Sequence, residues 1–280
     1  MTMESERKPL KLKFFHGLGD VLMFRNILKI LNRPIELYLD SRLGQSAIFA
    51  CEELVRVVST PSDPDAYREI KFYMEHSRPC QSGKATKPRI CMEHEFGLLR
   101  PDYEIRPLPL PFLDRIKTPA TQASMAFLED LGPYVVCHFQ GTALADAKNP
   151  SAPFAQKSVD RILAAGWGVV LINYDYVFHH CSNRDYAFVD HNRVRSTYRK
   201  LPMEVESLWT ILSGASAFFG VDSGPLHLAL CTPLPCTFIR NQRDFFRNFY
   251  DTGLETLSVI DVAEVEAIPP RLIPPLPSAI

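Results

Sequence analysis

Short apolar runs alternate with stretches of helical spacing along the first part of the chain. Residues 12–15 form a short, apolar-rich stretch, a glycine-rich turn follows, and apolar residues then recur at helical spacing over 21–31. This order predicts a strand, a turn and a helix. Further strands are predicted at 35–39 and 55–59, with a helix over 45–54 between them.

The pattern weakens between residues 60 and 118. Short strands are predicted at 70–74 and 89–92, with irregular loops between them. Prolines crowd the stretch 107–119, which indicates a connection rather than an element. A helix is predicted over 121–131.

Strands and helices alternate regularly again in the second half. Strands are predicted at 134–139, 169–173, 217–221 and 236–239, and helices at 155–165, 204–213 and 225–231. Such alternation in both halves predicts α/β architecture with two doubly wound domains, at 1–120 and 121–280. Ligands of such sheets bind where the strands end and the loops begin. The proline-rich end of the chain predicts an extended tail.

Composition excludes several function classes. The chain has 46% hydrophobic and 22% charged residues and a net charge of −1, which is typical of a globular protein and gives no electrostatic reason to bind nucleic acid. No apolar stretch is long enough for a transmembrane segment, and the charged start lacks a signal-peptide core. Seven scattered cysteines without a C-x-x-C pair also agree with a cytoplasmic protein.

The first candidate site is the turn Gly17-Leu18-Gly19-Asp20. Glycines let the backbone approach a ligand closely, and a carboxylate there is placed to accept a proton from a substrate hydroxyl. The spacing alone favours the alternative that Asp20 only caps the helix. The third glycine of the dinucleotide fingerprint is missing, and only Asp40 keeps that alternative open.

The second candidate site is the turn of Asp222, Ser223 and Gly224, which follows an apolar strand and precedes a helix. Backbone N–H groups at a helix start suit a diphosphate, and His227 lies about one turn further on. The residues alone leave open the alternative of a capped helix with a half-buried histidine.

The third candidate site follows the strand at 134–139. Gly141 and Thr142 come directly after it, and Lys148 follows within reach. The hydroxyl of Thr142 could donate to a phosphate oxygen and Lys148 could add positive charge. Taken alone, Lys148 is better explained as a solvated loop lysine. His179, His180 and Cys181 lack zinc spacing, so we predict no metal site there.

Together these three segments resemble the heptosyltransferase family, which includes the ADP-heptose:lipopolysaccharide heptosyltransferases. That family has a Gly-Asp pair opening the first helix, a Thr…Lys phosphate loop and a D-[ST]-G-x-x-H motif, all found here. The resemblance implies a GT-B fold of two Rossmann-like domains with a cleft between them. It also implies an inverting, metal-independent glycosyltransferase of lipopolysaccharide biosynthesis that needs no cofactor.

The resemblance also implies roles for single residues. Asp20 would be the catalytic base. The donor, an ADP-heptose-like nucleotide sugar, would be bound by Gly19, Gly141, Thr142, Lys148, Met203, Asp222, Ser223, Gly224 and His227. The acceptor would be a hydroxyl of a glycan, a lipid-linked molecule or a protein, with no nucleic acid and no membrane-spanning segment involved.

The sequence departs from the family pattern at the phosphate loop. The loop between Thr142 and Lys148 is longer, and Asn149-Pro150 replaces the usual Trp-Pro. Two alternatives therefore stay open: a nucleotide-sugar hydrolase or epimerase of the same fold, and a non-catalytic member that acts as a binding subunit.

Overall fold

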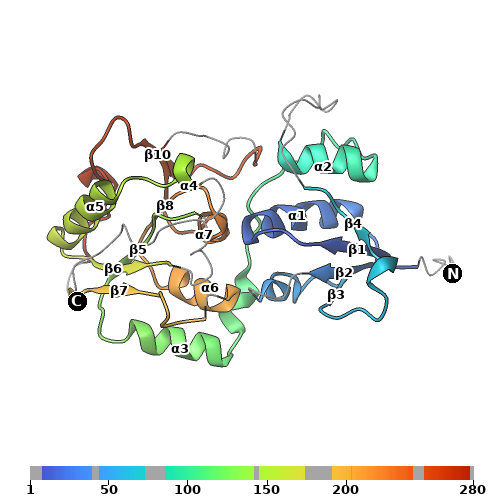
Figure 1. Cartoon of the computed structure of the whole chain (residues 1–280), viewed down its shortest axis with the longest axis horizontal. Coiled ribbons are helices and arrows are strands. Elements are labelled where there is room, and N and C mark those ends of the chain that lie inside the picture. The colour runs from blue at the N-terminus through green and yellow to red at the C-terminus, as the bar shows by residue number, and fades with distance from the viewer. Residues whose placement is uncertain are drawn as a thin grey trace. The chain divides into compact units, whose positions relative to one another are not determined.

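The structure is a computed structural model. It describes residues 8–39, 44–72, 86–141, 145–173, 191–202, 204–241 and 249–277. The chain divides into two compact units, Met1–Leu108 with Phe246–Gly253, and Pro109–Phe245 with Leu254–Ile280 (Figure 1). By this division, residues 109–120 lie in the second unit and residues 249–253 in the first.

The first unit contains a parallel four-stranded sheet of order β3-β2-β1-β4. Its elements are β1 (Leu10–Phe14), α1 (Leu18–Leu31), β2 (Ile35–Leu39), the 3₁₀ helix η2 (Gln45–Phe49), β3 (Val55–Val58), the 3₁₀ helix η3 (Pro64–Ala66), β4 (Arg68–Glu69) and α2 (Lys87–Phe96). The helix α1 ends at Asn32, which takes the left-handed conformation and donates its N–H to the carbonyl of Leu28. The expected strand, turn and helix at the start of the chain are thus confirmed.

Three expectations for this unit were wrong. Residues 89–92 lie within the helix α2, because Pro88 suits the first turn of a helix and Gly97 ends it at φ 62°. In place of a strand at 70–74, β4 covers only Arg68–Glu69, and residues 73 and 74 lie outside the described ranges. In place of a helix over 45–54 there is the short η2.

The second unit contains a six-stranded sheet of order β10-β9-β8-β5-β6-β7, in which every neighbouring pair is parallel. Its strands are β5 (Tyr134–His138), β6 (Gly168–Leu171), β7 (Val194–Ser196), β8 (Phe218–Gly220), β9 (Cys236–Arg240) and β10 (Leu257–Asp261). Its helices are η4 (Pro111–Arg115), α3 (Pro119–Leu128), α4 (Ala145–Lys148), α5 (Ala152–Ala164), α6 (Val205–Ser213), α7 (Gly224–Ala229) and η8 (Pro270–Leu272). The edge strands β7 and β10 were not predicted, and in β7 the single apolar residue is Val194.

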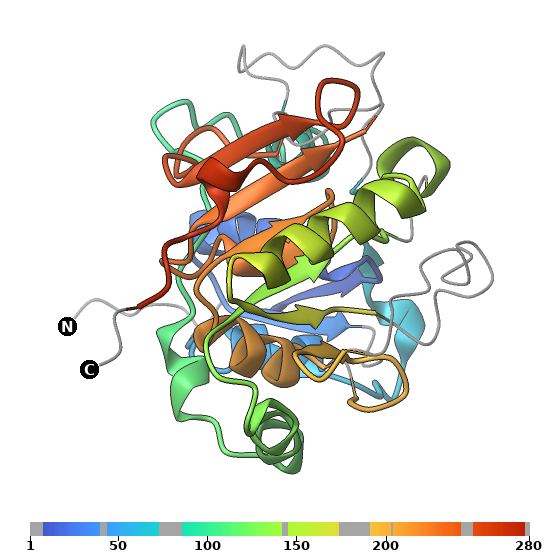
Figure 2. The same cartoon turned by 90° about the vertical axis from the view of Figure 1, so that its left-hand side faces the viewer.

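Helices cover both faces of this sheet. The helix α5 packs Phe154, Val159 and Ile162 against the face that carries Val135 and Cys137, and Figure 2 shows α5 crossing in front of the strands. The hydroxyl of Tyr134, whose side chain points to the opposite face, donates to the carbonyl of Ile211 in α6 at 2.8 Å. A sheet buried on both faces explains why its central strands are continuous apolar runs.

The proline-rich stretch before α3 belongs to the second unit. The indole N–H of Trp209 in α6 donates to Asp114 in η4 at 2.7 Å, and α3 packs on α6. This packing accounts for the place of residues 109–118 in the second unit. The proline-rich end of the chain is not free either, because the indole of Trp167 donates to the Pro274 carbonyl at 2.8 Å.

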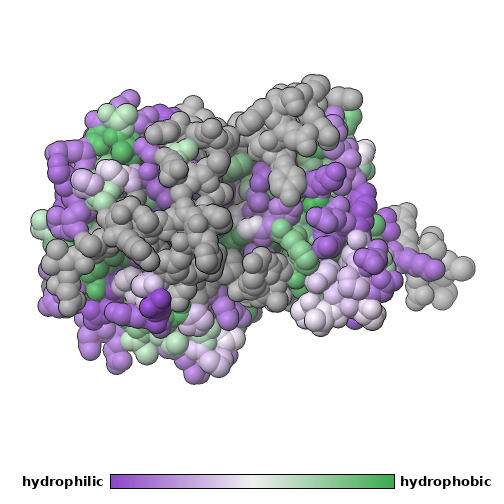
Figure 3. Space-filling view, viewed as in Figure 1, coloured by the Kyte–Doolittle hydropathy of each residue, from purple (hydrophilic) through white to green (hydrophobic). Residues whose placement is uncertain are grey.

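The surface is mixed in character. Most of the coloured area in Figure 3 is hydrophilic, with smaller hydrophobic areas between. Large apolar side chains are exposed at scattered positions, for example Leu54, Leu99 and Met125. Within the described ranges, the helices are too short or too polar to cross a membrane.

Candidate functional site

The strand order of the second unit defines where a ligand would bind. From β5 the chain continues outward to β6 and β7, then returns to the other side of β5 as β8. The crevice beyond the carboxyl ends of β5 and β8 is therefore a topological switch point, which is where doubly wound sheets bind ligands. The loops that leave β5 and β8 carry the third and the second candidate segments, so the fold brings these two together.

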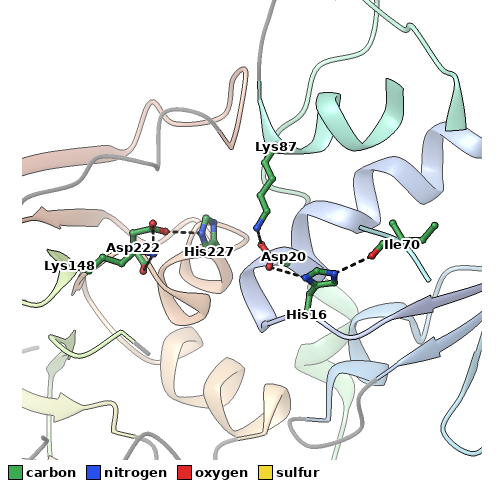
Figure 4. Close-up of polar contacts among 7 residues, drawn as sticks. All are labelled: His16, Asp20, Ile70, Lys87, Lys148, Asp222 and His227. Atoms are coloured by element: carbon green, nitrogen blue, oxygen red, sulfur yellow. Dashed lines mark hydrogen bonds and ion pairs between the residues drawn. The ribbon is translucent and has the colours of Figure 1, made fainter. Parts of the chain in front are cut away.

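Asp222 is the centre of this site (Figure 4). Its carboxylate is ion-paired with Lys148 Nζ at 2.8 Å, and His227 Nε2 lies 3.3 Å from its other oxygen. Lys148 Nζ also donates to the Asp222 carbonyl at 3.3 Å. Asp222 and His227 are 4% and 3% exposed in their side chains and Lys148 is 13% exposed, so all three groups are held in a largely dehydrated setting.

The electrostatics keep Asp222 ionised. Burial raises the pKa of its carboxyl group, but the hydrogen bond with His227 and the charge of Lys148 outweigh burial and lower the pKa to about 2. A carboxylate that stays charged can orient both Lys148 and His227. Lys148 is therefore part of a buried ion pair, which argues against a merely solvated loop lysine.

Asn149 directly follows α4 and joins the end of that helix to Gly141, which lies after β5. Its side chain accepts from the Gly141 N–H at 2.7 Å and donates to the Gly141 carbonyl at 3.3 Å. Asn241, after β9, donates to the Asn149 carbonyl at 2.8 Å. These bonds fix both ends of the lengthened loop, so the residue that replaces the family's tryptophan has a structural role of its own.

The remaining residues predicted for this site are placed as follows. Ser223 precedes α7, and its hydroxyl donates to the Val221 carbonyl at 3.1 Å instead of capping the helix. Gly224 is the first residue of α7, which has only 6 residues. Thr142 and Met203 lie outside the described residues.

A second cluster lies at the switch point of the first unit, between the carboxyl ends of β1 and β4. Gly17 occupies the N-cap position of α1, Gly19 is buried in its first turn, and the carboxylate of Asp20 is ion-paired with Lys87 at the start of α2. His16 Nδ1 lies 3.6 Å from the same carboxylate, and His16 Nε2 lies 3.2 Å from the carbonyl of Ile70 (Figure 4).

The surroundings of Asp20 favour its charged form. Burial raises its pKa, but the hydrogen bond with His16 and the charge of Lys87 outweigh burial, so the pKa is lowered. Asp20 keeps 22% of its side chain exposed, against 13% for Lys87. It is thus an ionised carboxylate that remains partly accessible, as a proton acceptor requires.

Sequence reasoning missed His16, Lys87 and Gln45 as members of this cluster. Lys87 was assigned to an irregular loop, but it is the first residue of α2. Its ammonium group lies 4.9 Å from the ring centroid of Phe72. Gln45 donates to the His16 carbonyl at 3.2 Å. The side-chain oxygen Oε1 of Gln45 and the hydroxyl of Thr86 are buried without a hydrogen-bond partner among the described residues. Only the fold brings these distant positions together.

His138, at the end of β5, is a buried neutral histidine. Its Nδ1 donates to the carbonyl of Ile172 at 2.8 Å. Burial lowers its pKa to about 4, against the opposing effect of that hydrogen bond. His138 is therefore uncharged at neutral pH and helps to hold the ends of β5 and β6 together.

This burial predicts a pH dependence of stability. The folded pKa of His138 lies below its ordinary value of 6.5, so the unfolded chain binds more protons between pH 6.5 and 4. We expect the free energy of unfolding to fall by about 3 kcal/mol as the pH drops through this window. In His138→Asn, which keeps a donor for the Ile172 carbonyl, urea titrations should show a free energy of unfolding without this decrease of about 3 kcal/mol. If the free energy of unfolding depends on pH in the same way in both proteins, the prediction is wrong.

Metal binding was not predicted by the sequence. Across the ranges that the structure describes, histidine, cysteine and acidic side chains do not gather in groups of three that could hold a metal ion. The candidate cluster at residues 179–181 lies outside those ranges.

The sequence matches no family model and no curated protein. The structure is similar to the glycosyl transferase family 9 protein from Veillonella parvula, with a TM-score of 0.63 and 12% identity over 93% of this chain and 89% of that one. It is also similar to Escherichia coli heptosyltransferase WaaC with ADP, at a TM-score of 0.53 and 14% identity over 90% and 93% of the two chains.

A third similar structure is that of the dodecameric iron-containing heptosyltransferase TibC from enterotoxigenic E. coli, in complex with ADP-D-beta-D-heptose. Its TM-score is 0.54 and its identity 19%, over 86% of this chain and 60% of that one. These matches confirm the predicted fold class and the resemblance. The chain has the GT-B architecture of two parallel α/β units, and in fold it resembles the heptosyltransferases.

Proposed function

We propose that this protein is a glycosyltransferase that moves a sugar from a nucleoside-diphosphate donor to a hydroxyl acceptor. The observation that carries the proposal is the buried group of Asp222, Lys148 and His227 at the switch point of a GT-B-type unit. The heptosyltransferases of this fold suggest an ADP-heptose-like donor. The acceptor, a hydroxyl of a glycan, lipid-linked molecule or protein, stays open.

In this proposal Asp222 organises the donor site. Its carboxylate holds Lys148 and His227, the two side chains that would bind the diphosphate. The charge of Lys148 offsets the negative charge that develops on the diphosphate as it leaves. Gly141, Thr142, Ser223 and Gly224 would add contacts to the phosphates and the sugar. Gly19 and Met203 would complete the donor contacts, Met203 by packing on the base.

Asp20 would act as the general base of the transfer. The acceptor oxygen attacks the anomeric carbon, the bond from that carbon to the diphosphate oxygen breaks, and the acceptor proton passes to Asp20. A single displacement of this kind inverts the anomeric centre and calls for no metal ion. The contacts with Lys87 and His16 keep Asp20 ionised and able to accept the proton.

The proposal is tested by a thermal-shift screen against ADP, UDP, GDP, CDP and TDP. A nucleotide that binds the folded protein at a hundred times its Kd stabilises it by about 2.7 kcal/mol, whereas the others leave Tm unchanged. We expect ADP to raise Tm of the wild type and to have a much smaller effect on Asp222→Asn, which loses the charge that orients Lys148.

The matched control is Asp160→Asn, at an exposed position of α5 where the carboxylate accepts from Gln156 at 2.9 Å. This variant should respond to ADP like the wild type. No shift with any of the five nucleotides would overturn the proposed donor site and favour a non-catalytic protein. Rapid sugar release from ADP-heptose without an acceptor would favour a hydrolase.

A further inference from the structure

Gln140 is a buried amide that the protein itself leaves without a partner. It lies two residues beyond the end of β5 and is 3% exposed. Neither its Nε2 nor its Oε1 has a hydrogen-bond partner within the described parts of the chain. A buried amide in this state destabilises the fold, so native proteins satisfy such groups with water or with a ligand.

The position of Gln140 favours a ligand. In the register of the sheet, His138 of β5 faces Gly220 of β8, and the same register two residues on sets Gln140 beside Asp222. The next residue is close to Asp222 as well, since a Cβ on Gly141 would lie 3.5 Å from the Asp222 carbonyl oxygen. Gln140 therefore adjoins the group that the proposed function assigns to the diphosphate.

The chemistry of the amide narrows the choice of ligand group. Its nitrogen donates two hydrogen bonds and its oxygen accepts. A phosphate has only acceptor oxygens, so it would leave Oε1 without a partner. Two neighbouring hydroxyl groups can both accept from Nε2 and donate to Oε1. An uncharged amide next to a paired carboxylate thus suits the sugar part of a nucleotide sugar.

We propose that Gln140 is a specificity-determining residue that binds a pair of neighbouring hydroxyls on the donor, either of its ribose or of the transferred sugar. This inference rests on the proposed function. It predicts that the free protein is destabilised by the same amide that strengthens binding of the donor.

The test is Gln140→Met, which keeps the length and volume of the side chain and removes its polar atoms. Without ligand, we expect Tm of the variant to rise by about 2–4 °C, because an unsatisfied amide has been removed. In titration calorimetry, its affinity for ADP-heptose should fall about tenfold to a hundredfold. Gln156→Met, at a partly exposed position of α5, is the matched control and should change neither quantity.

Comparison of two probes identifies the hydroxyls. Equal losses of affinity for ADP and ADP-heptose assign them to the ribose, and a loss for ADP-heptose alone assigns them to the transferred sugar. Unchanged affinity for both probes overturns the inference and leaves the proposed function standing. A lower Tm in Gln140→Met also overturns it, because buried water would then satisfy the amide. If the wild type binds neither probe, the ADP-heptose donor fails and this inference fails with it.

Discussion

Asp20→Asn is expected to slow sugar transfer by about 10²–10⁴-fold while leaving the affinity for the nucleotide unchanged. The asparagine has the shape of the aspartate and can still contact Lys87 and His16, but it cannot take up the acceptor proton. Rates measured with ADP-heptose at saturating donor, together with calorimetry on ADP, separate the two quantities. An inactive variant that binds ADP like the wild type would support Asp20 as the base.

The alternative is that Asp20 serves only as the structural partner of Lys87. In that case Asp20→Asn would lower Tm, and its rate would fall only as far as the folded fraction does. Asp102→Asn is a suitable control, because Asp102 is an exposed carboxylate of the same unit paired with Arg100 at 3.2 Å. A variant with near wild-type rates would exclude Asp20 as the base and make His16, whose Nδ1 lies 3.6 Å from the Asp20 carboxylate, the next candidate.

The sequence predicted the central framework well because buried parallel strands leave a strong pattern. β1, β2, β5, β6, β8 and β9 were all expected. β5, β6 and β8 are fully buried along their length, whereas buried and partly exposed residues alternate in β2. The motif around Asp222 was predicted at the end of β8, as the structure has it. Edge strands such as β7, with the polar segment Val194–Ser196, carry little hydrophobic signal and were missed.

The candidate sites were predicted unevenly, for a physical reason. Asp222 and His227 lie five residues apart, so one local motif contains both and predicts both. Lys87 meets Asp20 across 67 positions of sequence, and local patterning holds no information about such a contact. Gln140 was passed over for another reason. Gln140 directly precedes the candidate segment that begins at Gly141. Only the folded structure shows that its amide is buried without a hydrogen-bond partner among the described residues.

The second large effect is expected for Asp251, at the point where the chain returns to the first unit. Its side chain is fully buried, and one carboxylate oxygen accepts from Arg89 Nε at 2.9 Å, from Arg89 Nη2 at 2.5 Å and from the Ile105 N–H at 3.0 Å. Arg89 also donates to the carbonyls of Arg100 and Tyr103. One ion pair therefore ties together α2, the stretch at 100–105 and the returning segment.

Asp251→Ala should lower the free energy of unfolding by about 3–5 kcal/mol, because it leaves the buried guanidinium of Arg89 without a counter-charge. Removing the pair as a whole is less harmful than removing one member, so Arg89→Met combined with Asp251→Leu should recover part of the loss. Urea unfolding followed by circular dichroism measures all three proteins. The exposed pair of Arg100 and Asp102 supplies the control, and Asp102→Ala should leave the midpoint unchanged.

The unfolding midpoint of Asp251→Ala tests whether the first unit needs the returning segment for its stability. Residues 249–253 belong to the first unit although the rest of that unit ends at Leu108, and the N–H of Asp251 donates to the Ile105 carbonyl at 2.7 Å. If Asp251→Ala unfolds at the wild-type midpoint, the segment is only an attachment to a unit that is stable without it. If the midpoint falls as expected and the double variant restores it in part, the first unit needs this distant segment in order to hold Asp20 and Lys87 in place.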